Sequence, residues 1–116
     1  MERSLLNTTK KPVIVFAKGA WFAMEEISKL DCQVLGVDWN TKVGDLRDKL
    51  NVQQVLQGNL DPCMLYSSQE NIQTATLKML KEFGGGHIAN LGHGVYPDTP
   101  LDNVKVFVNT VKGFSY

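Results

Sequence analysis

Four short apolar runs, each followed by a stretch with helical spacing, constrain the fold of this 116-residue chain more than any other feature. The first run, residues 12–17, is rich in β-branched residues and does not alternate with polar ones, which is typical of a strand covered on both faces. Residues 33–38, 52–56 and 87–91 form the other three predicted strands. The pattern therefore predicts an α/β fold built from strand–helix units.

Helical signals follow each of these strands. Two helices are expected over residues 21–30 and 43–50. A capping box of Ser67 and Glu70 predicts the start of a third helix, and the glycines after residue 83 predict its end. Thr99 as N-cap, with Pro100 at the first helical position, predicts the last one. The predicted apolar stripes are Ile72, Ala75, Met79, Leu80 and Phe83 in the third helix, and Val104, Phe107, Val108 and Val111 in the last.

Consecutive strand–helix units favour an all-parallel sheet with right-handed crossovers. Two architectures fit: an open doubly wound sheet, or a partial (βα)8 TIM barrel containing four of the eight units. In both, ligands bind at the carboxyl ends of the strands. We expect one domain over residues 12–116, preceded by a leader over residues 1–11.

Composition excludes several classes of partner. The chain is 43% hydrophobic and 21% charged, which is typical of a globular protein, and its formal net charge is +0. Neither nucleic acid nor an anionic membrane is therefore an expected partner. The sequence contains no apolar run long enough to span a membrane, and its amino-terminal residues lack the apolar core of a signal peptide. We expect a cytoplasmic protein.

Motifs for nucleotide and metal binding are missing from the sequence. No glycine-rich phosphate loop follows a strand, and the run of three glycines at 84–86 follows a helix instead. Cys32 and Cys63 match no metal or redox spacing, so both are expected as thiols that behave as small hydrophobes. No second histidine lies near His93 at the spacing of metal ligands. The sequence therefore supports neither nucleotide binding nor a metal site within this chain.

His93 is the strongest candidate for a functional side chain. It stands between Gly92 and Gly94, directly after the fourth predicted strand, and such glycines leave room for a ligand to approach the backbone. The alternative is a histidine that only caps a neighbouring backbone group. His87 starts the same strand and is expected at the opposite end of the sheet. The other strand-end candidates are Lys18, Gly19, Asp38, Trp39, Gly58, Asn59 and Asp61.

Each of these further candidates has a competing structural interpretation. Lys18 would suit a Schiff base only if burial lowered its pKa, and a single strand-end lysine is weak support. Asp61 precedes a proline, so a turn or N-cap role is preferred. Asp38 is either a partner for Lys18 or a ligand, or a solvated carboxylate. Trp39 is expected to pack between strand and helix.

Four blocks of the sequence resemble the carboxy-terminal part of uroporphyrinogen decarboxylase. They cover residues 12–19, 36–39, 57–63 and 88–98, and they include the runs Gln-Gly-Asn-Leu-Asp-Pro and Leu-Gly-His-Gly. Their order and spacing also agree with that family. The resemblance extends from residue 12 to about residue 114.

This resemblance implies a (βα)8 barrel about three times as long as this chain, forming a cytoplasmic homodimer. The family removes the four acetate carboxyl groups of uroporphyrinogen to give coproporphyrinogen in haem biosynthesis, without a cofactor. His93 matches the family's histidine that lines the substrate cleft, so it is assigned to substrate binding. The family's essential aspartate and its carboxylate-binding arginines belong to segments that this sequence does not match.

The arginine content limits what the chain can do alone. A porphyrinogen with eight carboxylates calls for guanidinium groups, and the sequence has only Arg3 and Arg47, neither at a strand end. The resemblance implies that the intact parent protein is a decarboxylase. Because the chain lacks the arginines for this substrate, the isolated chain is predicted to be inactive. One alternative is a non-enzymatic half-barrel that associates with itself or with an amino-terminal half through exposed sheet edges. Another is an open-sheet ligand-binding domain.

Overall fold

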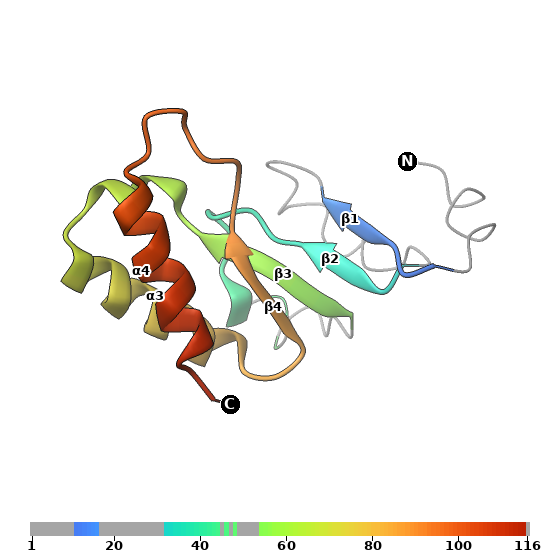
Figure 1. Ribbon diagram of the computed structural model, residues 1–116. Coiled ribbons are helices and arrows are strands. Elements are labelled where there is room, and N and C mark those ends of the chain that lie inside the picture. The colour runs from blue at the N-terminus through green and yellow to red at the C-terminus, as the bar shows by residue number, and fades with distance from the viewer. Residues whose placement is uncertain (1–10, 17–31, 45, 47, 49–53, 116) are drawn as a thin grey trace.

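Four parallel strands form one sheet in the computed structural model, which describes residues 11–16, 32–44, 46, 48 and 54–115 (Figure 1). The register aligns Leu56 with Leu35 on one side and with His87 on the other. The prediction of a parallel α/β sheet is therefore confirmed. The strands are β1 (Ile14–Phe16), β2 (Val34–Gly36), β3 (Val55–Leu60) and β4 (His87–Leu91), and they lie side by side in that order.

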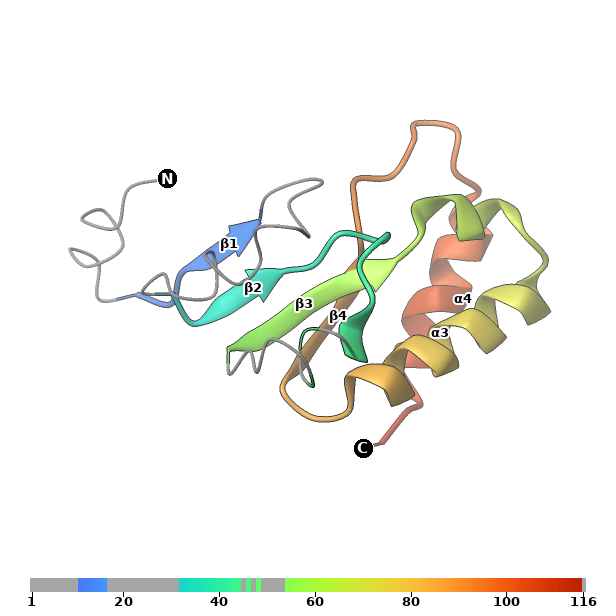
Figure 2. The ribbon, with the colours of Figure 1, turned by 180° about the vertical axis from the view of Figure 1, so that it is seen from behind.

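Three helical segments follow the last two strands. β3 leads into the 3-10 helix η3 (Pro62–Tyr66) and then α3 (Gln69–Phe83), whereas β4 leads into α4 (Leu101–Lys112). α3 and α4 lie next to each other on one side of the sheet, as Figures 1 and 2 show from opposite directions. The helix predicted over residues 21–30 lies outside the described residues. Of the one predicted over residues 43–50, Val43 and Leu46 are described and are buried.

The two faces of the sheet differ in burial. Leu35 and Leu56 are in register with His87, whose ring stacks on Phe83 of α3, and they have no exposed surface. Burial of such side chains is the main favourable term in folding. On the other face, Ile14, Phe16 and Ile88 are 51%, 44% and 42% exposed. We call the first the covered face and the second the open face.

β3 is longer and later than the sequence predicted. The turn-forming residues after 56 suggested an end there, yet the strand continues to Leu60 because Gly58 and Asn59 pair with Ala89 and Asn90. Gly58 has φ +142°, and a Cβ there would lie 2.6 Å from the Val37 carbonyl oxygen. A glycine therefore lets the strand pass close to its neighbour, and the same residue looks like a turn signal in the sequence.

The start of α3 is one residue later than predicted. Ser68, not Ser67, is the N-cap, and its side chain accepts a hydrogen bond from the Asn71 N–H at 3.1 Å. Ser67 instead closes η3, since its own N–H donates to the Met64 carbonyl. The prediction that Ser67 and Glu70 form a capping box at the start of α3 was therefore wrong. The glycine stop is confirmed, because Gly84 follows the last turn with φ +63°.

α4 also begins one residue later than predicted. Pro100 is the N-cap and makes no side-chain capping bond, because its ring has no hydrogen-bonding atom. The Thr99 hydroxyl, expected as the cap, donates to the Tyr96 carbonyl within the preceding loop instead. Phe107 is buried as expected, but Val108 is 39% exposed and does not belong to the inner stripe. Val106 packs against the core instead. The stripe of α3 is confirmed, with Thr76 as a further buried member.

Candidate functional site

A cleft of about 510 Å³ lies on the open face near the carboxyl ends of the strands. All four strands contribute to it, together with the first residues of the loop that joins β4 to α4. Its apolar lining includes Ile14, Phe16 and Val95. Its polar lining includes Gln57, Asn90 and His93.

His93 stands where the chain leaves the sheet. The Gly92 N–H donates to the Leu60 carbonyl at 2.8 Å, which extends the β3–β4 ladder by one residue. The loop over residues 92–100 then projects beyond the strand ends (Figure 1). His93 and Gly94 are both exposed. The structure thus places His93 at the rim of the cleft, while its contact with a substrate stays a prediction.

The residues after β2 lie against the same loop. Asp38 is only 5% exposed, so the interpretation as a solvated carboxylate was wrong. Trp39 follows it and is 48% exposed, so it is not packed between strand and helix as expected. A Cβ on Gly92 would lie 2.3 Å from the Trp39 backbone nitrogen. The two connections are therefore in direct backbone contact.

Asn59 lies within β3 rather than in a turn. Its side-chain Nδ2 donates to the Asp38 carbonyl at 3.0 Å and to the Thr41 carbonyl at 2.9 Å. These bonds hold the connection after β2 to the middle strand. The alternation of apolar and polar residues from 56 to 60 was the signal that would have placed Asn59 on a strand.

Of the remaining candidates at the strand ends, one has a structural role and two are not described. Asp61 is the N-cap of η3, and its carboxylate accepts a hydrogen bond from the Cys63 N–H at 2.9 Å, as the structural interpretation predicted. Lys18 and Gly19 lie outside the described residues. Cys32 is buried and Cys63 is exposed, and no disulfide joins these two described residues.

His87 lies at the opposite end of β4 from His93, as expected. Its Nε2 donates to the Gly58 carbonyl at 2.6 Å, since a carbonyl oxygen can only accept. Its ring stacks on Phe83 of α3 with 3.6 Å between centroids and 6° between planes. His87 therefore joins the sheet to the helical layer and is not part of the cleft.

A hydrogen-bonded tyrosine anchors the far end of the 92–100 loop. The Tyr66 hydroxyl donates to Asp98 Oδ1 at 2.5 Å, and the rings of Tyr66 and Tyr96 lie 6.4 Å apart. The bond to Asp98 raises the pKa of Tyr66 above its ordinary value, because ionised Tyr66 could not donate it. No spacing in the sequence pairs residues 66 and 98, so sequence analysis missed this contact.

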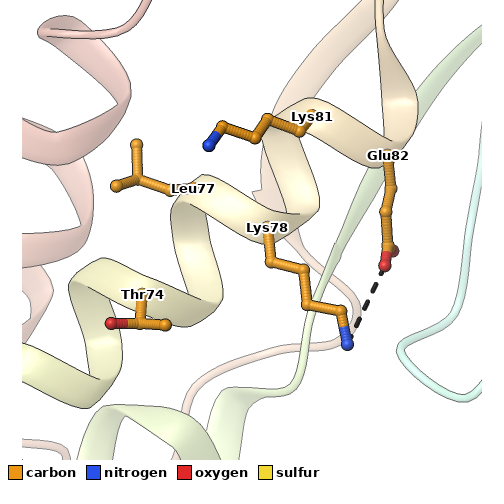
Figure 3. Close-up of a pocket in the computed structure, with 5 residues that line it drawn as sticks. All are labelled: Thr74, Leu77, Lys78, Lys81 and Glu82. Atoms are coloured by element: carbon orange, nitrogen blue, oxygen red, sulfur yellow. Dashed lines mark ion pairs between the residues drawn. The ribbon is translucent and has the colours of Figure 1, made fainter.

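A second hollow of about 490 Å³ lies on the outer surface of α3 (Figure 3). All five residues that line it belong to that helix, and Lys78 reaches Glu82 across 3.9 Å. No strand end contributes to this hollow, so we do not regard it as the candidate site. Within the described part of the chain, no cluster of three or more His, Cys, Asp or Glu side chains is suited to a metal ion. No described helix is long and apolar enough to cross a membrane.

The cleft is lined by both apolar and polar side chains. Ile14 and Phe16 offer apolar surface to a ligand, whereas the amides of Gln57 and Asn90 can donate or accept hydrogen bonds. The imidazole of His93 can do either as well. Such a lining suits a ligand with an apolar body and polar substituents.

Residues 2–114 match the family model for uroporphyrinogen decarboxylase. The chain belongs to this family. It is 42% identical over 111 residues to the uroporphyrinogen decarboxylase of Coxiella burnetii, an alignment that covers 94% of this chain and 31% of that relative. For the sheep (Ovis aries) enzyme the identity is 45% over 101 residues, with 86% and 28% covered. The chain therefore spans about a third of the length of the curated uroporphyrinogen decarboxylases it matches, and the predicted resemblance is confirmed.

Proposed function

We propose that this chain forms one wall of the substrate cleft of a uroporphyrinogen decarboxylase, with His93 in contact with the porphyrinogen. The observation that carries the proposal is the cleft itself, which brings His93 onto the open face at the carboxyl ends of four parallel strands. In a (βα)8 barrel the helices lie outside and ligands bind at this end of the strands. The family membership supplies the reaction, which is the loss of carbon dioxide from the four acetate groups of uroporphyrinogen to give coproporphyrinogen.

The sheet topology supports a barrel segment rather than an open doubly wound sheet. A doubly wound sheet has a point where the strand order reverses, whereas β1 to β4 follow one another in chain order. The open face would then be turned toward the barrel interior. Its half-exposed Ile14, Phe16 and Ile88 fit that position, because interior positions of barrels are filled by such side chains.

The described residues that line the cleft include no arginine or lysine. A substrate with many carboxylates requires cationic partners, so these are expected from another segment of the complete barrel. We therefore propose that the isolated chain does not turn over uroporphyrinogen. A porphyrinogen substrate, a homodimer, a cytoplasmic location and the lack of a cofactor are further parts of this proposal.

A chimera tests the proposal. This chain replaces the matching segment of the Coxiella burnetii enzyme, and coproporphyrinogen formation is measured for the chimera, for its His93→Asn variant and for the isolated chain. We expect an active chimera and no turnover by the isolated chain. His93→Asn should lose at least about tenfold, because the shorter asparagine cannot reach the Nε2 position and a hydrogen bond made there to a charged group is lost. Gln73→Ala, at an exposed position of α3, is the matched control and should keep full activity. A fully active His93→Asn chimera contradicts the role of His93.

The open face also favours a second function, a non-enzymatic half-barrel that associates with itself or with an amino-terminal half. Exposed apolar residues on a sheet face promote association in water. Light scattering of the isolated chain would show oligomers, and Ile88→Lys would shift them toward monomer. Leu77→Lys, on α3, is the control that should leave the mass unchanged. A monodisperse wild-type monomer would exclude self-association.

A further inference from the structure

The connections that follow β2 and β4 meet although β3 separates the two strands. Their contact is backbone on backbone. A Cβ on Gly92 would lie 2.3 Å from the nitrogen and 2.5 Å from the Cα of Trp39. No side chain fits such a gap, so the backbone of Trp39 rests directly on the residue that precedes His93.

Asn59 of β3 holds the Trp39 connection in this place. Its Nδ2 donates to the carbonyls of Asp38 and Thr41, which lie on either side of Trp39 in the chain. The Thr41 N–H donates in turn to the Asp38 carbonyl at 3.1 Å, which closes the turn. Both hydrogens of one amide group thus fix both ends of a single turn.

The other side of Gly92 is held by the sheet. Its N–H donates to the Leu60 carbonyl, one residue after Asn59 along the same strand. Gly92 is buried between this hydrogen bond and the Trp39 backbone. His93 therefore leaves the sheet from a backbone position that is fixed from two directions.

We propose that Asn59 is a positioning residue for His93, acting through the Trp39 turn and its contact with Gly92. This inference deepens the proposed function and rests on it for its catalytic meaning. A hydrogen-bond donor is required at residue 59. An aspartate of the same shape would place carboxylate oxygens against two carbonyl oxygens, so the turn would move away from Gly92.

Histidine NMR of the whole chain tests this arrangement. The sequence has two histidines, so the ring signals report both ends of β4. His87 is bonded to the Gly58 carbonyl, next to Asn59 in the chain, so it is the reference signal for the Gly92 variant only. Asn59→Asp removes the donor, and Gly92→Ala forces the backbones apart without removing a hydrogen bond. The controls are Asn109→Asp, the same substitution on exposed α4, and Gly94→Ala, where a Cβ would meet nothing within 4 Å.

The expected result is selective. Both test variants shift the ring signals of His93, and Asn59→Asp also speeds exchange of the Gly92 amide by about tenfold or more. The His93 signals stay unchanged in both controls, and the His87 signals stay unchanged in Gly92→Ala. Unchanged His93 signals in either folded test variant would overturn the proposal. Equal shifts of His87 and His93 in Gly92→Ala would also overturn it, because the contact between Gly92 and the Trp39 turn would then support the fold in general. If Asn59→Asp does not fold, Gly92→Ala decides.

The NMR result and the chimera result are separable. The ring signals are measured without substrate, so they test the arrangement even if the chain had no part in decarboxylation. A selective His93 shift with a fully active His93→Asn chimera would leave the arrangement and remove its catalytic meaning. A chimera that depends on His93, without the selective shift, would leave the proposed function and refute the role of Asn59.

Discussion

The covered and open faces of the sheet are made by alternate residues of the same strands, yet one face contributes to stability and the other to the candidate site. The covered face buries Leu35 and Leu56 completely under the helical layer, and there His87 stacks on Phe83. The open face leaves Ile14, Phe16 and Ile88 half-exposed beside a cleft with His93 at its rim. The comparison teaches that stability and the candidate site are separated across one sheet, so substitutions on the two faces should have different effects.

The largest expected difference is between Leu56→Ala and Ile88→Ala. Leu56 is fully buried on the covered face, so its truncation should lower the free energy of unfolding by about 2–5 kcal/mol. Ile88 is 42% exposed on the open face, and its truncation should cost less than about 1 kcal/mol. Urea denaturation followed by circular dichroism measures both. Equal losses would show that another segment covers the open face in the folded chain.

The two histidines should separate in the same way. His87→Ala removes a donor to the Gly58 carbonyl and a ring stacked on Phe83, so it should cost about 1–3 kcal/mol. His93→Ala, at an exposed loop position, should stay within about 0.5 kcal/mol of the wild type. The same denaturation measurement applies. A costly His93 variant would mean that this residue supports the fold rather than the cleft.

Substitution of Asn103, in the helical layer, should have a smaller effect on the free energy of unfolding. Its Nδ2 donates to the Leu65 carbonyl at 2.7 Å, which joins α4 to η3. Asn103→Ala should lower the free energy of unfolding by about 1 kcal/mol. Asn109→Ala, at an exposed position of the same helix, is the control and should change it by less than about 0.5 kcal/mol. A similar result for both variants would show that the link to η3 does not contribute, because the gain in helix propensity from Asn to Ala is shared by the two positions.

The smallest effect concerns the exposed Tyr66 and depends on pH. The bond to Asp98 raises the pKa of Tyr66 above 10.0, so its contribution to stability is complete below that pH and disappears as pH rises through the raised pKa. Tyr66→Phe should therefore have a lower urea midpoint than wild type at pH 7 and pH 9. The difference should vanish at higher pH. Tyr96→Phe, in the neighbouring ring, is the control, and a gap that persists in strong alkali would contradict the assignment.

Much of the fold could be predicted from local patterns. The fourth strand, the stripe of α3 and the glycine after it were correct, because periodicity and helix-capping chemistry depend on residues close together in the chain. Two of the errors were at element ends. Ser67 was assigned to α3 although it closes η3, and Gly58 was interpreted as a turn although it pairs within β3. In both cases the residue makes a contact that the local rule does not consider: Ser67 bonds to Met64 in the preceding helix, and Gly58 pairs with Ala89 of the neighbouring strand.

The candidate site could be predicted only in outline. The position of His93 between two glycines after a strand placed it at the carboxyl end of the sheet, and the structure agrees with that location. Gln57 and Asn90, which share its cleft, were not predicted, because a strand pattern does not tell which face stays open. The link between Tyr66 and Asp98 joins residues far apart in the chain, so no spacing could indicate it.

The sequence by itself determined the parallel α/β class, the family and the place of His93 after a strand, because these depend on hydrophobic period and on motifs of a few residues. Only the tertiary structure decided that Asn59 holds the turn around Trp39 and that this turn rests on Gly92. These contacts join three different strands and the connections after them. Their distances are set by how the strands pair and pack, and no local property of the chain encodes that directly.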